Sequence, residues 1–392
     1  MDIRDKVTLD NIAEISSKSM DKIPRCLVLF ESACKSKRTF ETYEFLLKKF
    51  LEWCNKDHES LLMVPVTKLE DLLQDYCMYL KKRIDCKIMD KDGRELEMLS
   101  PNSITTYFNP IFRFLKVNRV KIDKESIVQL FPDKVKLGGN DAVTTEQLVE
   151  LVSVSNTKRN KAMIHFFSAT GARPEAVCEL QLKHLAEYQD GFYKVILYSD
   201  DFKHEMITFL NPESVKALEE YFEERRSNGE KLTPESYVFV VKDESGTHSM
   251  TRNVLENMMG RVWKRSGIKR IKTRNRYNLA STTSIRKRFD TILEMNPEVS
   301  VGIIQYLMDH TGYLSGTHYR RPTESNIFEV YRVVSAELMI SDVLRMELQL
   351  KQKDDEIYKN ESEKDIRIKE LEEKAERTES LLLKVLERLD NS

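Results

Sequence analysis

The sequence predicts a mainly α-helical protein with one small β-sheet. Apolar residues recur at steps of three and four along most of the chain, which is the spacing of one helix face. The exception is residues 192–209, where apolar and polar residues alternate around a polar turn at 199–204, which is typical of a β-hairpin. Hydrophobic residues make up 41% and charged residues 32% of the 392 residues, as in helix-rich soluble proteins of the cell interior.

Three amphipathic helices are expected in the first third of the chain. The first begins at Thr39, and the second begins after Thr67, which we predict to be its N-cap. The third follows Ser100-Pro101, because a proline in the first helical turn favours a helix start. The polar stretch 85–99 predicts a loop between the second and the third helix.

The chain divides by composition. Residues 132–140, with Gly138 and Gly139 near their end, have the composition of a linker between domains. Apolar periodicity is weak before residue 38. We therefore predict an N-terminal arm at 1–37, a helical domain at 38–132, a second domain at 141–342 and a charged helical tail at 343–392.

The second domain opens with a sequence typical of a capping box, Thr144 to Gln147. A turn at 170–174 separates the first two of its predicted helices. Helices are expected at 159–170, 175–185, 212–226 and 253–266, and a further strand at 237–241.

Charge is unevenly distributed. The formal net charge is only −1, so nucleic-acid binding must depend on local clusters of Lys and Arg. One run of basic residues follows residue 263 without an acidic residue among them. It is either a solvated loop or a DNA contact. Its members are Lys264, Arg265, Lys269, Arg270, Lys272, Arg274 and Arg276.

The tail has the composition of a long helix. Glu, Lys, Leu and Ile dominate residues 344–389, which contain neither Pro nor Gly. Upstream of residue 368, acidic and basic residues interrupt the apolar repeat, so a solvated single helix is the alternative there. A short coiled-coil seam is predicted from Leu371, Ala375, Leu382, Val385 and Leu389.

The six cysteines are scattered, without a C-x-x-C pair or a histidine at zinc-finger spacing. We expect reduced thiols, no disulfide framework and no metal site. The N-terminus lacks a signal-peptide pattern, and no apolar run approaches the length needed to span a membrane. These observations predict a cytoplasmic protein without membrane partners.

Residues 304–321 are the strongest candidate for a site. His310 precedes Tyr319 by nine residues, with Gly312 and Gly316 between them. Two reactive side chains on either side of a turn-rich segment suggest chemistry. The alternative is that Tyr319 is a half-buried anchor on a surface helix.

Four sequence elements place further candidates in order. SATGARPEAVCELQLKHL contains Arg173, SDDFKHEMITFL contains Lys203, SIRKRFDTIL contains Arg286, and MDHTGYLSGTHY contains His310 and Tyr319. This order resembles the catalytic domain of the tyrosine recombinases, the phage-integrase family, including its archaeal and viral integrases. Residues 39–130 resemble the family's helical core-binding domain more weakly.

The resemblance implies a site-specific recombinase of a mobile element that cleaves and rejoins DNA through a 3′-phosphotyrosine intermediate. Tyr319 would be the nucleophile, Lys203 the general acid, and Arg173, Arg286 and His310 would bind the scissile phosphate. No cofactor or metal is implied. The expected partners are a double-stranded DNA attachment site and three further copies in a homotetramer, with localisation at the nucleoid of the host cell. A segment at 328–344 would be exchanged between protomers.

Three positions depart from the family pattern. Thr283 stands where a histidine or lysine is usual, Asp309 replaces the glycine before His310, and Ala176 replaces an acidic residue that supports the first arginine. Glu175 is a possible substitute for that acidic residue. Thr283 leaves open a catalytically silent DNA-binding or architectural protein of the same fold. A type IB topoisomerase is a further alternative, against which the separate N-terminal helical domain argues.

Overall fold

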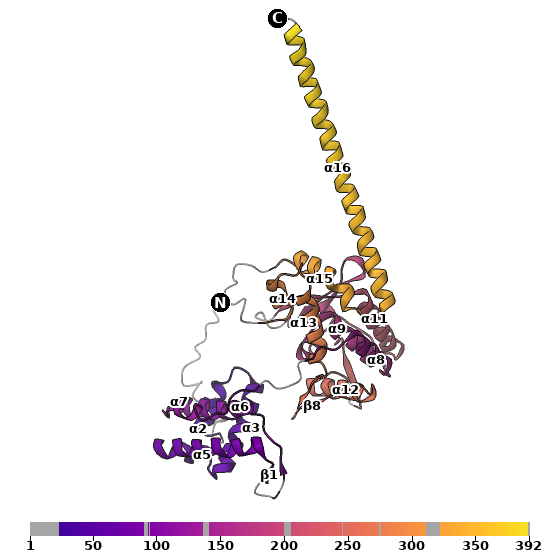
Figure 1. The fold of residues 1–392 in the computed structure, drawn as a ribbon. Coiled ribbons are helices and arrows are strands. Elements are labelled where there is room, and N and C mark those ends of the chain that lie inside the picture. Colours follow the sequence, from indigo (N-terminus) through magenta and orange to yellow (C-terminus); the bar gives the residue numbers. More distant parts are fainter. Residues whose placement is uncertain are drawn as a thin grey trace, which may run out of the picture. The chain divides into compact units, whose positions relative to one another are not determined.

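The chain forms two compact units, Met1–Leu137 and Gly138–Ser392, in a computed structural model (Figure 1). The structure describes residues 23–89, 93, 95–135, 141–199, 205–244, 246–273, 276–310 and 322–390. The predicted class, mainly α with a small β-sheet, is confirmed. No helix among the described residues is both long enough and apolar enough to cross a membrane.

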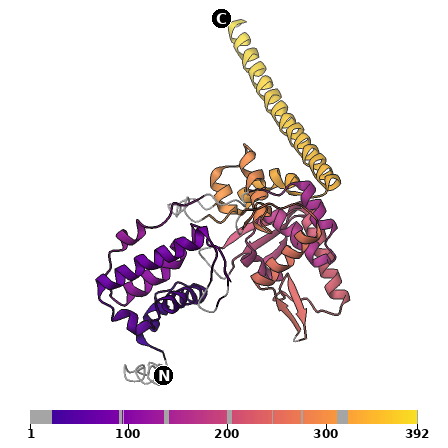
Figure 2. The same ribbon diagram turned by 60° about the horizontal axis from the view of Figure 1, so that its bottom comes forward.

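The first unit is a helical bundle with one very short hairpin. Four of its helices, α2, α3, α5 and α6, lie side by side (Figures 1 and 2). Its elements are α2 (Arg25–Ser32), α3 (Lys37–Cys54), α4 (His58–Leu62), α5 (Val66–Asp85), β1 (Ile88–Met89), β2 (Glu95–Leu96), α6 (Ser103–Val117) and α7 (Lys124–Val128).

Aromatic rings form much of the core of this unit. Phe30 meets Phe114 edge to face with ring centroids 5.5 Å apart, and Tyr76 lies 5.7 Å from Phe108. All four rings are at most 2% exposed. Burying such large side chains is what stabilises a bundle of short helices.

Three local predictions in this unit were wrong. Residues 25–32, which we assigned to the arm, form α2, because Cys26 and Phe30 complete the core. Thr67 lies inside α5, whose N-cap is Pro65. The predicted loop at 85–99 contains the antiparallel hairpin β1–β2, in which Ile88 pairs with Leu96.

The second unit packs helices around a three-stranded sheet. Its elements are α8 (Thr145–Ser153), α9 (Lys158–Thr170), α10 (Pro174–Cys178), β3 (Leu185–Glu187), β4 (Tyr193–Leu197), β5 (Met206–Leu210), α11 (Pro212–Ser227), β6 (Val240–Asp243), β7 (Gly246–Ser249), α12 (Arg252–Arg265), β8 (Lys272–Thr273), β9 (Arg276–Tyr277), α13 (Thr283–Met295), α14 (Val301–Leu307), α15 (Glu324–Leu338) and α16 (Asp342–Asp390). Thr144 caps α8 in the predicted capping box.

The sheet confirms the predicted hairpin and extends it. β4 and β5 pair antiparallel, and β3 adds a third antiparallel strand on the other edge of β4. The helix predicted at 175–185 ends at Cys178, because the next residues pair with a distant segment. The Val238 N–H donates to the Leu180 carbonyl at 2.8 Å, and Gln181 bridges to Tyr237.

Helix α15 docks onto its own unit. Tyr331 is fully buried, and its hydroxyl donates to the Ala169 carbonyl on α9 at 2.9 Å. Phe328 packs edge to face against Phe192 and Phe209 of the sheet region. Apolar side chains of residues 328–344 complete the core of this single chain, and their expected exchange between protomers stays a prediction.

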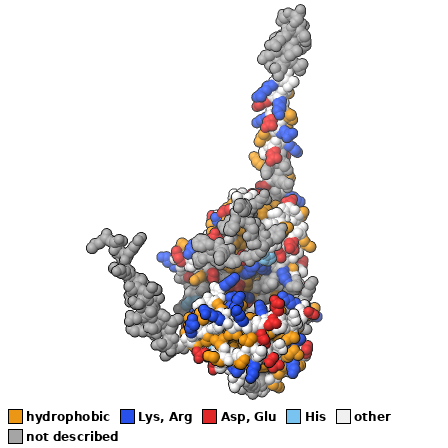
Figure 3. Space-filling model, turned by 90° about the vertical axis from the view of Figure 1, so that its left-hand side faces the viewer, with side chains coloured by type: hydrophobic (Ala, Val, Ile, Leu, Met, Phe, Trp, Pro, Cys, Tyr) orange, Lys and Arg blue, Asp and Glu red, His pale blue; other side chains and the backbone are white. Residues whose placement is uncertain are grey.

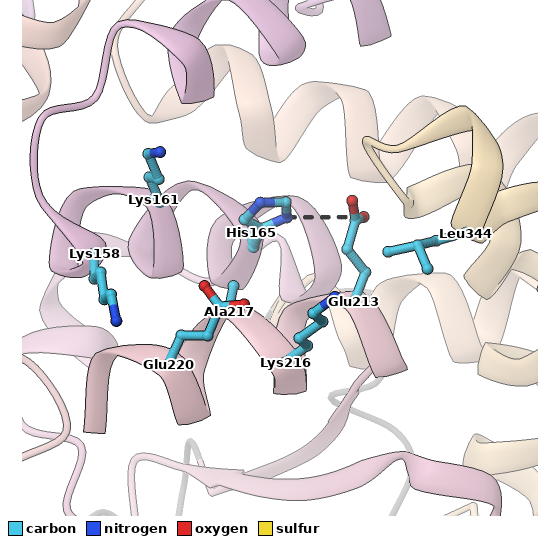
Figure 4. A pocket seen from close by; sticks show the side chains of 8 residues that line it. All are labelled: Lys158, Lys161, His165, Glu213, Lys216, Ala217, Glu220 and Leu344. Atoms are coloured by element: carbon cyan, nitrogen blue, oxygen red, sulfur yellow. Dashed lines mark ion pairs between the residues drawn. The ribbon is translucent and has the colours of Figure 1, made fainter. Parts of the chain in front are cut away.

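Glu213, at the start of α11, holds the junction between α15 and α16. Its two carboxylate oxygens accept the N–H groups of Ile340 at 2.7 Å and Ser341 at 2.8 Å. His165 Nδ1 of α9 lies 3.7 Å from the same carboxylate, and both side chains line a cavity of about 180 Å³ (Figure 4). Glu213 thereby ties the long helix α16 to the body of the unit.

The environment of Glu213 favours its charged form. Burial alone would raise the pKa of its carboxyl group, but His165 and the two backbone N–H donors outweigh burial and lower this pKa below 4.5. A carboxyl group with a lowered pKa in the folded state contributes stability above its ordinary pKa. That contribution is lost as the pH falls through the lowered value.

We expect Glu213→Ala to lower the free energy of unfolding by about 3 kcal/mol at neutral pH, because two buried N–H groups lose a charged acceptor. Glu220→Ala, which removes an exposed carboxylate at the same cavity, is the control and should change stability by less than about 0.5 kcal/mol. Urea unfolding measures both. The difference in the free energy of unfolding between the unaltered chain and Glu213→Ala should become smaller below pH 4.5. A difference that stays constant there would contradict the stabilising role of the charged carboxylate.

Candidate active site

Arg173 lies at a sharp turn between two helices. Gly171 ends α9 in the left-handed conformation, with φ of 57°, and Arg173 is the N-cap of α10. The turn is tight because Phe289 of α13 packs against it. Glycine suits this position twice, since it tolerates the positive φ and has no Cβ to meet the ring.

Arg286, in the first turns of α13, is held by main-chain carbonyls. Its Nη1 donates to the Gly171 carbonyl at 2.6 Å, and its Nη2 donates to the Met308 carbonyl. These acceptors belong to the ends of α9 and α14. One guanidinium group thus joins three helices at the point where Arg173 lies.

Asp309 joins Arg173 to the same point. It follows α14 in the left-handed conformation, with φ of 44°. Its carboxylate accepts from Arg173 Nη1, and its carbonyl accepts from Arg173 Nη2 at 3.0 Å. The next residue, His310, lies with its Nδ1 3.0 Å from Gln305 Oε1, which leaves the Nε2 edge of this exposed ring facing away from that contact.

Tyr198, at the end of β4, is the site residue that sequence reasoning missed. It has a positive φ of 56°, and it is half-buried beside Arg173. Burial raises the pKa of its hydroxyl, whereas a hydrogen bond with Arg173 opposes that rise. In the sequence it is one of several alternating residues of the hairpin, and only its position next to the turn at 199–204 could have drawn attention to it.

The two arginines form a cationic site. Burial, and then the positive charge of Arg173, lower the pKa of Arg286 to about 10. Arg286 therefore remains charged at neutral pH, but at an electrostatic cost. An anion that binds between the two charged guanidinium groups would offset this electrostatic cost. Their planar donor groups suit an anion with several oxygens, such as a phosphate.

The structure brings together three of the predicted site residues, Arg173, Arg286 and His310. Lys203 and Tyr319 lie outside the described residues. In the sequence, Lys203 falls between strands β4 and β5. The segment of Tyr319 begins directly after His310.

The positions that depart from the family pattern have distinct surroundings. Thr283 is exposed in the first turn of α13, one turn before Arg286. Glu175 forms an ion pair with Arg252 of α12, and its expected support of Arg173 stays a prediction. Ala176 is buried in the core. Asp309 is the carboxylate that contacts Arg173.

The basic run begins in the last turn of α12 and continues into the β8–β9 hairpin. Lys272 and Arg276 are exposed on β8 and β9, and Arg274 between them lies outside the described residues. Arg270 lies over the ring of Tyr277, 4.2 Å from its centroid. Lys264, Arg265 and Lys269 are exposed just before the hairpin.

A second basic surface lies in the first unit and was missed in the sequence. A groove of about 1030 Å³ runs along α6 and the segment that follows it. Residues 113–121 contain four basic residues and no acidic one, but only the fold brings them onto one groove. Lys and Arg side chains also gather in a band on the face drawn in Figure 3. The basic residues that line the groove are Arg113, Lys116, Arg119, Lys121 and Lys124.

We expect Gly171→Ala to destabilise the second unit by about 3 kcal/mol, because a Cβ there would lie 2.5 Å from the Phe289 ring in addition to the backbone strain. Gly267→Ala is the matched control: φ is 69° there, but nothing lies within 4 Å of the added Cβ. It should cost only about 1 kcal/mol. Equal losses for both variants in urea unfolding would show that Phe289 does not close on the turn.

Known proteins resemble this chain both in sequence pattern and in fold. Residues 141–326 match the model of the phage integrase family. The Tn1549 transposon integrase in complex with circular intermediate DNA has a similar structure, with a TM-score of 0.53 and 15% identity over 79% of this chain and 99% of that one. The XerH site-specific recombinase bound to difH substrate gives a TM-score of 0.50 and 15% identity over 87% and 92% of the two chains.

At such low identity, these two structures show a shared fold. Among curated proteins, none matches this chain in sequence. The family match covers the residues that carry Arg173, Arg286 and His310 in the predicted order. In this region, residues 141–326, the chain is thus similar to the phage integrase family.

Proposed function

We propose that this chain is a site-specific DNA recombinase, an integrase, that cleaves and rejoins DNA strands through a 3′-phosphotyrosine intermediate. The observation that carries the proposal is the pair of arginines, Arg173 and Arg286, held at the meeting point of α9, α13 and α14. Both come from sequence elements in the order that the family requires.

Such a pair suits the chemistry of phosphodiester exchange. Attack on a phosphodiester places additional negative charge on the non-bridging oxygens in the transition state. Fixed donors aimed at those oxygens stabilise this state more than the ground state. The guanidinium groups of Arg173 and Arg286 stay charged and present planar forks of donors, and His310 Nε2 adds a further contact.

The remaining roles belong to Tyr319 and Lys203. Tyr319, nine residues after His310, is the proposed nucleophile. Its phosphotyrosine ester conserves the energy of the broken bond for the second strand. Lys203, between β4 and β5, is the proposed general acid for the leaving 5′-oxygen. This scheme assigns no step to a metal or a cofactor.

Two basic surfaces support DNA as the substrate. The groove of the first unit presents five basic side chains, and the β8–β9 hairpin of the second unit presents more. Clustered Lys and Arg release counterions from the phosphate backbone on binding, which supplies affinity without reading sequence. A net charge of −1 does not oppose this, because the clusters are local.

Recombination of two duplexes requires four protomers, and we propose a homotetramer on DNA. Besides the expected exchange of residues 328–344, the long helix α16 is a candidate for contact between protomers. Its exposed apolar residues include Leu350, Ile357, Ile366 and Leu371. Residues 368–389 would then pair as the predicted coiled-coil seam. We propose that the protein acts in the cytoplasm of the host cell, on an attachment site in the nucleoid.

A nicked suicide duplex tests the proposed function. Its nick lets the strand end diffuse away after cleavage, so an active enzyme remains covalently attached to DNA. We expect the unaltered chain to form this adduct and Tyr319→Phe to bind the same DNA without forming it, since only the hydroxyl group is removed. Binding without an adduct by the unaltered chain would establish the alternative, a catalytically silent DNA-binding protein, which Thr283 leaves open.

Arg173→Ala and Arg286→Ala should each lower the rate of adduct formation about a hundredfold, which corresponds to roughly 3 kcal/mol of transition-state stabilisation. Affinity for the duplex should change much less, because the basic surfaces supply most of the binding energy. Single-turnover rates at saturating protein separate the two effects. Equal losses in rate and affinity would show that the arginines only anchor phosphate.

A further inference from the structure

One residue accepts both hydrogen bonds that connect Arg173 to α14. The Asp309 carboxylate accepts a hydrogen bond from Arg173 Nη1, and the Asp309 carbonyl accepts one from Arg173 Nη2 at 3.0 Å. The Asp309 side chain is only 13% exposed, whereas that of Arg173 is 36% exposed. The carboxylate is therefore on the protein side of the guanidinium group, and part of Arg173 still faces solvent.

The two residues of α10 considered for this task have other surroundings. Ala176, one turn later, has no polar side chain, and Glu175 pairs with Arg252. A long arginine side chain loses roughly 2 kcal/mol of rotamer entropy when it is fixed. A charged acceptor in a mostly buried position offsets part of that loss.

Asp309 also counters repulsion between the two cations. The positive charge of Arg173 disfavours the charged form of Arg286, and the negative charge of Asp309 favours it. Without a carboxylate here, two neighbouring guanidinium groups would tend to separate. With it, they can remain close enough to bind one phosphate.

The contacts leave donors for a substrate. A guanidinium group has five N–H donors; the two hydrogen bonds to Asp309 and the one with Tyr198 use three of them, which leaves two. We propose that Asp309 is a positioning residue that orients Arg173 toward the scissile phosphate, an inference that rests on the proposed recombinase function. The carboxylate stays in place when the phosphate binds, and does not compete with it.

The backbone at Asp309 makes a clean test possible. Its φ of 44° is readily adopted by glycine and asparagine, so Asp309→Gly and Asp309→Asn keep the carbonyl contact without new strain. Asp190→Gly is the matched control, because Asp190 also has a positive φ, 54°, but lies in the short turn before β4 and outside the site. It should leave the cleavage rate unchanged.

We expect Asp309→Gly to slow adduct formation on the suicide duplex roughly tenfold at saturating protein, and Asp309→Asn roughly threefold, with DNA affinity within about twofold of the unaltered chain. The decisive readout is a double-mutant cycle. In the Arg173→Ala background, Asp309→Gly should cost less than about twofold, because a residue that acts through Arg173 has nothing left to position.

Additive losses in the cycle would show a merely structural role and overturn the inference. Faster cleavage by Asp309→Gly would also overturn it, because the carboxylate would then compete with the phosphate for Arg173. If the unaltered chain forms no adduct, the proposed function itself fails. If it forms one that Arg173→Ala slows while Asp309→Gly does not, the inference about Asp309 alone fails.

Discussion

The hydrogen bonds of Arg286 to two main-chain carbonyls are the constraint on which the site depends. Gly171 and Met308 end different helices, and their carbonyls lack helical partners at those ends. Arg286 donates to both, so the carbonyl groups that join α9 and α14 also orient the guanidinium group that we propose to bind phosphate. The low exposure that makes this arrangement rigid also lowers the pKa of Arg286 to about 10, which shows the electrostatic cost of burying it.

The turn at Gly171 shows how tightly fold and site are coupled. Its positive φ and its contact with Phe289 place Arg173 at the start of α10. Asp309 then reaches Arg173 from α14. The cationic pair and its carboxylate therefore come from segments up to 136 residues apart, and each depends on the correct packing of α9, α13 and α14.

Much of this could be predicted from the sequence, because the signals are local. Helical periodicity, the alternation around 199–204 and the glycine before Arg173 are all readable within a few residues. The order of Arg173, Arg286 and His310 then indicated the family.

The predictions that were wrong or incomplete concern features that depend on contacts between residues distant in the sequence. The helix at 175–185 ends early because Leu180 pairs with Val238. The start of the helical domain was placed too late because Phe30 joins a core whose other members come after residue 38. Asp309 was recognised as a departure, but its contact with Arg173 spans 136 residues and has no local signature. The basic groove of the first unit likewise depends on how α6 and its following segment fold.

The central claim is that Arg173 and Arg286 bind one scissile phosphate. A structure of the Tyr319→Phe variant on its attachment-site DNA tests this most directly, because that variant should hold the duplex uncleaved. The account predicts non-bridging oxygens of a single phosphate within hydrogen-bonding distance, about 2.7–3.2 Å, of both guanidinium groups, with residue 319 in line for attack. It also predicts the Asp309 carboxylate still bound to Arg173. A phosphate held only by the groove of the first unit or the β8–β9 hairpin, with both arginines unoccupied, would contradict it.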